Sequence, residues 1–141
     1  MKISARNQLK AEITSIKTGA VNSQIGAKLK GGESLNAIIT VESEKNLDLK
    51  VGKEVLFIFK APSVMIAKVD ESGIKLSARN QLNGKVKSVN MGAVNAEIIV
   101  SLNAEQEISA IITRESAQNL ALNCGDEVIA IIKSSSIIIG A

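Results

Sequence analysis

The chain has 141 residues and a mass of 14.8 kDa, enough for one ordinary domain or two small ones of about 70 residues. Hydrophobic residues make up 45% of it, so a core is expected, but there is no His, no Trp, no Tyr and only one cysteine, Cys124. This composition excludes the usual zinc sites, Ser-His-Asp and Cys-His catalytic sets, and an internal disulfide. An enzyme is not expected, because no acid, base or nucleophile stands out.

The net charge is only +3, and it is unevenly divided. Residues 1–68 contain eleven basic and six acidic side chains, whereas residues 69–141 contain six and eight. A protein that binds duplex nucleic acid usually has a stronger basic stripe. The chain also has no apolar run of 18 residues and no start typical of a signal peptide, so we expect a cytoplasmic protein that does not bind membranes.

The sequence is a tandem repeat. The segment Ser-Ala-Arg-Asn-Gln-Leu at 4–9 recurs at 77–82, and Gly-Ala-Val-Asn at 19–22 recurs at 92–95. The two copies align without a gap at a separation of 73 residues, and 30 of 68 aligned positions are identical. We therefore expect a first domain at 1–68, a short join at 69–73 and a second domain at 74–141, with the two copies packed together.

Each copy is expected to be mostly β, because residues 21–29 alternate between apolar and polar types, the period of a half-buried strand. Gly31-Gly32 predicts a hairpin turn, and Thr40 is a helix-capping residue. In the first copy we predict strands at 9–17, 21–29, 34–40, 54–60 and 63–68, with a short helix at 41–47. This order predicts an all-β protein: two tandem OB-like five-stranded Greek-key barrels, each with a short helix between strands 3 and 4.

Some apolar segments need a partner beyond the core of their own copy. The runs at 55–59 and 137–139 are apolar on both faces. Either the chain forms oligomers, or the two copies cover one another. Cys124 occupies the position of Val51 in the first copy, so we expect it to be a small core residue.

Polar residues of one kind recur in both copies. They are hydroxyl, amide and cationic side chains without a carboxylate, a set suited to holding an oxyanion by charge-assisted hydrogen bonds. The structural alternative is that Ser-Ala-Arg-Asn forms a turn, Thr40 only caps a helix and the lysine is an ordinary charge at a strand end. The members of the set are Ser4, Arg6, Asn7, Thr40, Ser43 and Lys60, with Ser77, Arg79, Asn80, Thr113, Ser116 and Lys133.

The Gly-Ala-Val-Asn segments also allow two interpretations. They could be hairpin turns in which Gly19 and Gly92 adopt a positive φ angle. Alternatively, their backbone N–H groups and the side chains of Asn22 and Asn95 could bind an anion.

Together these segments, with Ile-Thr-x-Glu-Ser at 39–43 and Lys-Ala-Pro-Ser-Val-Met-Ile at 60–66, resemble the Mop or molbindin family of molybdate-binding domains. The resemblance covers both copies. It implies OB-like barrels, a homotrimer of two-domain chains, and molybdate or tungstate held at subunit interfaces without direct side-chain bonds to the metal. It also implies a cytoplasmic store or buffer of the anion, with no organic cofactor.

The resemblance implies two kinds of site. The first kind would use Ser4, Ala5, Arg6, Thr40, Ser43, Lys60 and Ala61 in one copy, and Ser77, Ala78, Arg79, Thr113, Ser116, Lys133 and Ser134 in the other. A second kind would use Ala20, Val21, Asn22, Ala93, Val94 and Asn95. Because Ser134-Ser135 replaces Ala61-Pro62, we expect the backbone and the affinity to differ between the copies at that point.

An alternative function is nucleic-acid binding by an OB fold. Such surfaces usually stack bases on aromatic side chains, and this chain offers only Phe57 and Phe59, both in a core-like run. The leading expectation is therefore oxyanion storage, with no nucleic acid among the partners.

Overall fold

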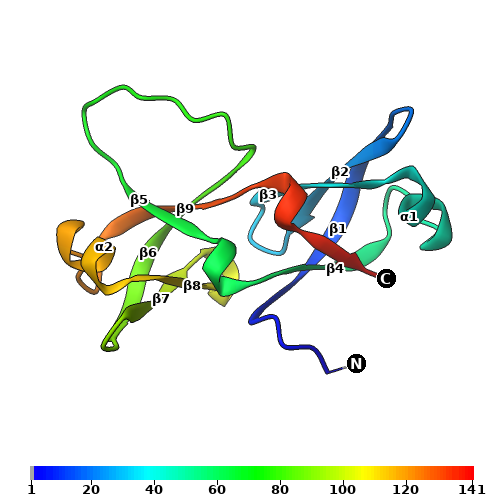
Figure 1. The fold of residues 1–141 in the computed structure, drawn as a ribbon. Helices are drawn as coiled ribbons and strands as arrows, with labels where there is room; N and C mark the ends of the chain where they lie inside the picture. Colours follow the sequence, from blue (N-terminus) through cyan, green and yellow to red (C-terminus); the bar gives the residue numbers. More distant parts are fainter. Residues whose placement is uncertain (1) are drawn as a thin grey trace.

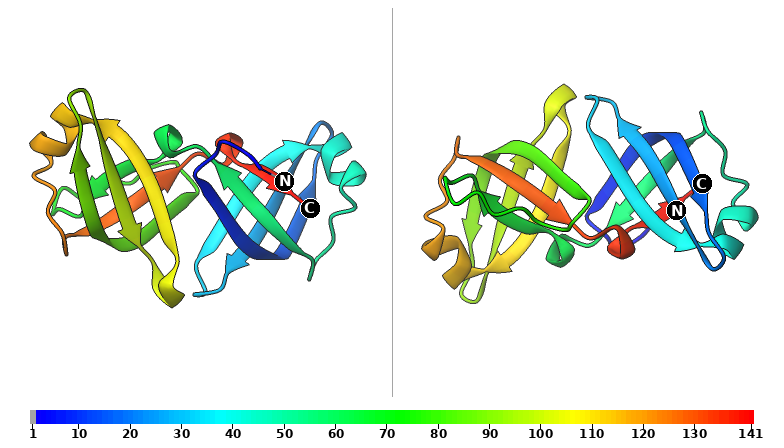
Figure 2. Two further views of the ribbon diagram at one scale, coloured as in Figure 1. Left: turned by 90° about the horizontal axis from the view of Figure 1, so that it is seen from below. Right: turned by 90° about the horizontal axis from the view of Figure 1, so that it is seen from above.

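The computed structural model describes residues 2–141 and consists of two halves that lie side by side, each with five strands (Figures 1 and 2). The first repeat contributes β1 (Asn7–Thr18), β2 (Asn22–Leu29), β3 (Ser34–Thr40), α1 (Val41–Asn46), β4 (Glu54–Phe59) and β5 (Met65–Lys68). The second contributes β6 (Asn80–Met91), β7 (Asn95–Ser101), β8 (Glu107–Thr113), α2 (Arg114–Asn119), β9 (Glu127–Ile132) and β10 (Ile138–Gly140). Short 3₁₀ turns lie at Ala61–Ser63, Asn103–Glu105 and Ser134–Ser136. The all-β class and the order of elements are confirmed.

The last strand of each repeat belongs to the sheet of the other repeat. The two antiparallel sheets have the strand orders β10-β4-β1-β2-β3 and β5-β9-β6-β7-β8. Ile138 of β10 pairs with Ile58 of β4, and Met65 of β5 pairs with Ile131 of β9. In Figure 1 the green β5 crosses to the second half and the red C-terminal segment returns to the first, so both termini lie there.

This exchange corrects the expectation that strand 63–68 completes its own copy. The strand forms, as β5, but it pairs with β9. The boundaries 1–68 and 74–141 describe the repeat in the sequence, whereas each folded half takes four strands from one repeat and one from the other. A 3₁₀ turn at Ala61–Ser63 separates β4 from β5, and after it the chain pairs with the neighbouring sheet instead of folding back on β4.

The first long strand of each repeat is an interior strand that pairs on both sides, and it is bulged. β1 pairs with β4 through residues 7–12 and with β2 through residues 11–18, and its register with β2 shifts between Ile13 and Ser15. β6 shifts at the equivalent place, between Val86 and Ser88. A bulge increases the local twist and bend of a strand, which curls the sheet around its core.

Two buried asparagine side chains join the halves. The amide of Asn7 donates from Nδ2 to the carbonyl of Ser109 and accepts from its N–H, both at 2.8 Å. Asn80 makes the same pair of bonds to Asn36, at 2.8 and 2.7 Å. Asn7 is 3% exposed and Asn80 is fully buried. Each amide therefore satisfies the backbone of the other half's edge strand, β8 or β3, in place of a further strand.

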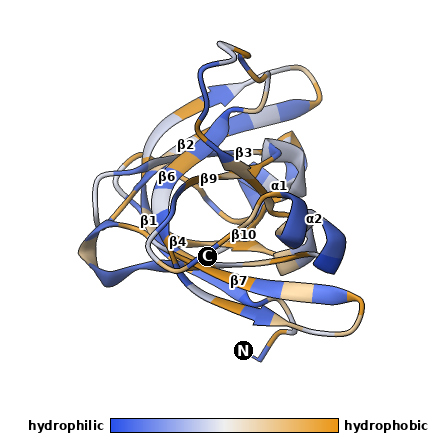
Figure 3. Ribbon diagram, turned by 90° about the vertical axis from the view of Figure 1, so that its left-hand side faces the viewer, coloured by the Kyte–Doolittle hydropathy of each residue, from blue (hydrophilic) through white to orange (hydrophobic). Residues whose placement is uncertain are grey.

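The core follows the alternation expected of half-buried strands. Along β7, buried residues alternate with exposed or partly exposed ones, and both hydrophilic and hydrophobic colours occur along this strand in Figure 3. Phe57 and Phe59 are buried, as expected, and so is Ile58, which pairs with β10. The apolar runs on two faces are thus partly covered by the other repeat of the same chain.

Two local expectations were wrong. Cys124 is exposed, because it lies in the loop after α2, where Leu122 is the residue that enters the core. Gly19 and Gly92 do not have positive φ angles. A side chain is excluded there for another reason: a Cβ at Gly19 would lie 2.8 Å from the carbonyl oxygen of Asn22.

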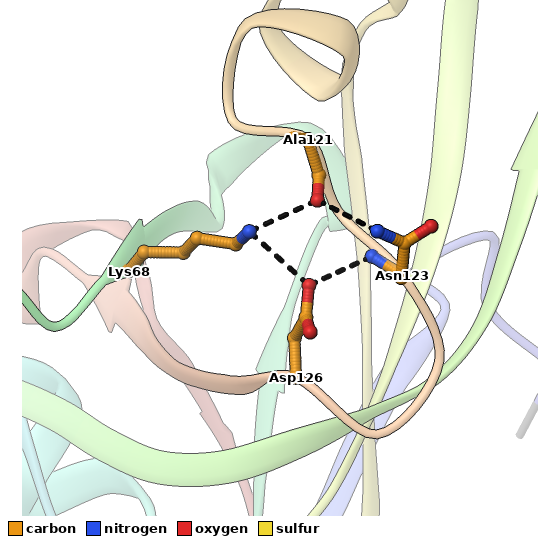
Figure 4. A network of polar contacts seen from close by, with 4 residues as sticks. All are labelled: Lys68, Ala121, Asn123 and Asp126. Carbon is orange, nitrogen blue, oxygen red and sulfur yellow. Dashed lines mark hydrogen bonds and ion pairs between the residues drawn. The ribbon is translucent and has the colours of Figure 1, made fainter.

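The exchanged strand β5 is fastened at its end by Lys68 (Figure 4). Its ammonium donates to the carbonyl of Ala121 at 2.9 Å and pairs with Asp126 at 3.2 Å. Asp126 also accepts from the N–H of Asn123 at 2.8 Å, and these bonds, that from Asn123 first, lower the pKa of Asp126. The strand from the first repeat is therefore tied to the loop after α2 of the second.

Of the helices formed within residues 2–141, none combines the length and apolar character needed to cross a bilayer.

Candidate anion-binding site

The strand register brings the Ser-Ala-Arg segment of each repeat next to its lysine. Asn80 pairs with Ile132, so residues 77–79, just before β6, run beside Lys133 and Ser134, just after β9. Asn7 pairs with Phe59 in the same way, which places Arg6 beside Lys60. Residues from opposite ends of each repeat thus meet just beyond the ends of two paired strands.

In the second repeat these residues line a pocket of about 490 Å³. Its polar lining residues are Ser77, Arg79, Lys133, Ser134 and Ser135, and no acidic residue is part of its wall. Apolar walls are supplied by Ile38 of β3, Met65 of β5 and Ile131 of β9, so both halves contribute. Two cations and three serines without a carboxylate favour an anion over a cation.

Ser134 carries a polar atom without a partner. Its residue is 7% exposed, and its hydroxyl is buried without a hydrogen bond. A buried hydroxyl that lacks a partner costs free energy, so such groups in native proteins usually have one. An anion in the adjoining pocket would supply an acceptor. Ala61 stands at the equivalent place in the first repeat and has no hydroxyl.

The backbone of this segment is the same in both repeats, contrary to expectation. Lys60 and Lys133 each precede a three-residue 3₁₀ turn, with φ, ψ angles of −80°, 144° and −66°, 136°. The carbonyl of each lysine accepts from the N–H three residues on, that of Ser63 or Ser136, at 2.9 Å. Serine can adopt the backbone angles that proline enforces, so losing Pro62 does not change the turn. The expected difference in affinity stays a prediction.

Arg6 and Arg79 have different surroundings. The guanidinium of Arg6 pairs with Glu97 of β7 at 2.7 Å. The hydrogen bond to Glu97, and then its charge, raise the pKa of Arg6 above its already high ordinary value. Within residues 2–141, Arg79 has no ion-pair partner within 4.0 Å.

In the second repeat, the threonine and serine of the helix cap line a different pocket from the one that the arginine and lysine line. The Thr40 side chain accepts from the N–H of Ser43 at 3.1 Å, and Thr113 accepts from that of Ser116 at 3.0 Å. These are helix N-caps, as the structural interpretation expected. Thr113 and Ser116 line a pocket of about 660 Å³ with Asn95 and the exchanged strand β5. Met65 lines both this pocket and the one beside Arg79.

The Gly-Ala-Val-Asn segments form the tips of the β1–β2 and β6–β7 hairpins. The N–H of Gly19 donates to Asn22 at 2.8 Å, and Gly92 donates to Asn95 at the same distance. The turn interpretation is therefore correct for the backbone. Val21 and Val94 are 72% and 73% exposed, so both tips present an apolar side chain to solvent. The predicted anion sites at Ala20, Val21, Asn22, Ala93, Val94 and Asn95 stay predictions.

Both repeats match one known protein family. The family described as the TOBE domain matches residues 3–66 and again residues 76–139. The chain belongs to the TOBE domain family. Its two TOBE repeats coincide with the two copies seen in the sequence.

Similar proteins share the tandem arrangement. The chain is 37% identical over 139 residues to the molybdenum transport protein ModE of Azotobacter vinelandii and 39% identical over 139 residues to the molybdenum-pterin-binding protein MopA of Rhodobacter capsulatus. These matches cover 99% of the chain but 51% and 52% of those proteins, so the chain spans about half the length of the curated relatives it matches. The structure superposes on that of the cytoplasmic molybdate-binding protein ModG with molybdate bound, with a TM-score of 0.96 and 45% identity, covering 100% of this chain and 99% of that one.

Three side chains that hold the backbone of the predicted site segments were not predicted from the sequence. The Gln8 side chain donates to the carbonyl of Ala5 at 3.1 Å, and Gln81 donates to that of Ala78 at 2.8 Å, so each holds its Ser-Ala-Arg segment in place. Arg114 donates to the carbonyl of Gly92 at 3.0 Å beside a hairpin tip. The glutamines recur in both copies, which was an available signal, whereas Arg114 replaces Val41 and was not.

Proposed function

We propose that this protein binds molybdate, and tungstate in competition with it, as an intracellular store or buffer of the oxyanion. The observation that carries the proposal is the pocket beside Arg79 and Lys133, which combines two cations and three serines with no carboxylate. The likeness to ModG over the whole chain supports the same ligand. The chain's own residues would hold the anion by hydrogen bonds alone, so no reaction is needed for uptake or release.

The energetics of such a site are adequate. Hydrogen bonds that involve a charged partner contribute about 1.5–3 kcal/mol each. A micromolar complex needs about 8 kcal/mol, so four or five such bonds, less desolvation and ordering costs, are enough. Arg79, Lys133, Ser77 and Ser134 supply this number of donors in one pocket.

We further propose that three chains assemble and that the assembly completes the sites. Within one chain the Arg79 pocket and the Thr113 pocket are separate but meet at Met65, which is 50% exposed. Ile138, the equivalent residue of the other repeat, is 62% exposed. Covering these apolar residues with a neighbouring chain would let its hydroxyls approach the cations. Subunit number is measured by native mass spectrometry, and a monomer with bound molybdate would contradict this arrangement.

The function is tested by titrating the protein with molybdate in a calorimeter. Arg79→Ala and Lys133→Ala should each lower the number of anions bound, because a charged donor is lost without loss of core volume. The matched control is Lys87→Ala, which removes an exposed lysine paired with Glu107, outside the pocket. Tungstate should displace molybdate, and the smaller sulfate should compete poorly. Unchanged binding in both pocket variants, or equal affinity for sulfate, would contradict the proposal.

The alternative function, nucleic-acid binding, has no observation in its favour. Phe57 and Phe59 are 0% and 2% exposed, so neither aromatic ring is available to stack on a base.

A further inference from the structure

The two repeats differ at a position of their second strand, which in the second repeat holds a carboxylate against the arginine of the other repeat's Ser-Ala-Arg segment. Position 97 of β7 is Glu, and the equivalent position 24 of β2 is Gln. Glu97 pairs with Arg6 at 2.7 Å, an ion pair that joins the second half to the segment before β1. The side chain of Arg6 is 48% exposed and that of Glu97 is 30% exposed, so the pair is open to an incoming anion.

The corresponding contact in the other repeat is neutral. Gln24 pairs across the sheet with Ile38, which lines the Arg79 pocket, so position 24 is next to that pocket. Its amide donates to the side-chain oxygen of Asn36 at 3.3 Å. No carboxylate lines the pocket, and among residues 2–141 Arg79 forms no ion pair within 4.0 Å.

We infer that Glu97 is an affinity-determining residue that makes the two arginine sites unequal, with the Arg79 site tight and the Arg6 site weak. The inference rests on the proposed function and concerns how strongly each site holds its oxyanion. It assigns to Glu97 a role that the shared motif of the two repeats does not contain.

The physical argument has two parts. A dianion that approaches Arg6 must displace the carboxylate of Glu97 from the guanidinium or share its donors. If the carboxylate stays nearby, its charge repels the dianion, and repulsion at short range is screened only weakly when solvent is partly excluded. A charge-assisted hydrogen bond is typically worth about a factor of ten or more in affinity, so we expect the Arg6 site to be at least about tenfold weaker.

A second difference acts in the same direction and must be separated from the first. Ser134 supplies a buried hydroxyl at the Arg79 site, whereas Ala61 supplies none at the Arg6 site. Ala61→Ser therefore serves as a control variant: it adds a neutral donor without touching Glu97. Its effect on affinity should be similar for a dianion and for a monoanion.

The experiment is a calorimetric titration of the full chain with molybdate and with perrhenate, a tetrahedral monoanion. Wild type should show two classes of molybdate site, of which Arg79→Ala removes the tight one. Glu97→Gln should strengthen the weak class about tenfold for molybdate and by a smaller factor for perrhenate, because repulsion depends on the charge of the anion. Gln24→Glu should weaken the tight class, and it provides the reciprocal test if Glu97→Gln fails to fold.

The outcomes separate the two proposals. A wild-type chain that binds no molybdate overturns the proposed function. Binding in a single class that Glu97→Gln and Gln24→Glu leave unchanged overturns the inference and leaves the function standing. A weaker Arg6 class in Glu97→Gln also overturns it, since Glu97 would then be orienting the arginine for the anion rather than competing with it.

Discussion

The two repeats have the same backbone arrangement but stabilise it with different side chains. The first residue of β1 and that of β6 are the same: Asn7 and Asn80 bind the edge strand of the other half through two hydrogen bonds each. A primary amide donates and accepts in the geometry of a peptide group, and few other side chains do this. The repeats agree here because there is little chemical alternative.

Elsewhere the repeats solve the same problem in different ways. Beside α1, the carboxylate of Glu44 accepts hydrogen bonds from the hydroxyls of Thr18 and the buried Ser23. Beside α2, the equivalents of Glu44 and Ser23 are Ala117 and Ala96, both buried. A hydrogen-bonded polar cluster in one repeat and two small apolar side chains in the other thus occupy equivalent positions. Either can pack the helix against its sheet, provided that no buried polar group is left without a partner.

The carbonyls after each helix are also satisfied differently. Lys53 donates to the carbonyls of Leu47 and Asp48 within the first repeat, at 2.8 and 3.4 Å. In the second repeat the position of Lys53 is Asp126, and the cation comes instead from Lys68 at the end of the exchanged strand. In the first repeat the carbonyls after the helix therefore bind a lysine of the same repeat, whereas in the second repeat they bind a lysine of the first repeat.

The largest expected effect on stability comes from removing the asparagine amide that both repeats share. Asn80→Ala should lower the free energy of unfolding by about 3 kcal/mol, because it leaves the part-buried N–H and carbonyl of Asn36 without partners. Asn7→Ala should cost a similar amount through Ser109. Urea denaturation measures both. A loss below about 1 kcal/mol in each variant would show that water replaces the amides and that they do not hold the halves together.

A smaller effect is expected where the β2–β3 and β7–β8 turns differ. Gly31-Gly32 in the first repeat is replaced by Ala104 and Glu105, which have φ angles of 57° and 60°. Left-handed backbone costs a non-glycine residue about 1 kcal/mol, so Ala104→Gly and Glu105→Gly should each raise stability by up to about that amount. Gly32→Ala, at φ 92° with open space around it, is the matched variant and should lower the melting temperature. Stabilisation by Gly32→Ala would contradict this account.

The two lysines that bind the carbonyls after the helices, Lys53 and Lys68, should affect amide hydrogen exchange in different parts of the chain. Lys68→Ala should speed amide hydrogen exchange in β5 several-fold, because its end loses its bonds to Ala121 and Asp126. Lys53→Ala is the matched variant and should speed exchange around the end of α1 without affecting β5. Equal protection of β5 in both variants would mean that the ladder with β9 alone holds the strand.

The smallest effect is the dependence of stability on pH that Glu44 contributes in the first half, where its equivalent in the second half, Ala117, cannot titrate. The hydrogen bonds from Ser23, and then Thr18, lower the pKa of Glu44 in the folded chain. Its stabilising contribution is therefore present above the pKa of the unfolded chain and is lost as the pH falls toward the lowered value. Glu44→Gln should reduce the loss of stability between about pH 5 and pH 3 in thermal melts. The same acid dependence in Glu44→Gln as in wild type would assign it to other carboxylates.

Sequence reasoning located the elements well because the signals are local. Thr40 caps α1 as predicted, and the alternation at 21–29 became β2 (Asn22–Leu29). The exchange of β5 and β10 could not be predicted, because the segments after Lys60 and Lys133 are similar apolar strands. Each would pair almost equally well with β4 or β9, so pattern alone does not choose between the two sheets.

The proposed site divides in the same way. The grouping of Arg79 with Lys133 follows from strand pairing once the strands are known. The pairing of Arg6 with Glu97 does not, because it links residues from different repeats and depends on how the halves pack. The burial of Asn7 and Asn80 was missed for the same reason: their partners, Ser109 and Asn36, belong to the opposite half.

The crossing of β5 and β10 makes the tandem chain the covalent form of a two-fold dimer. Two separate single-repeat polypeptides could adopt the same architecture by donating their final strands to each other, and joining them end to end would require no change of fold. Neither 70-residue piece contains a complete five-stranded sheet, so a cut in the segment between β5 and β6 should yield fragments that recombine rather than fold independently.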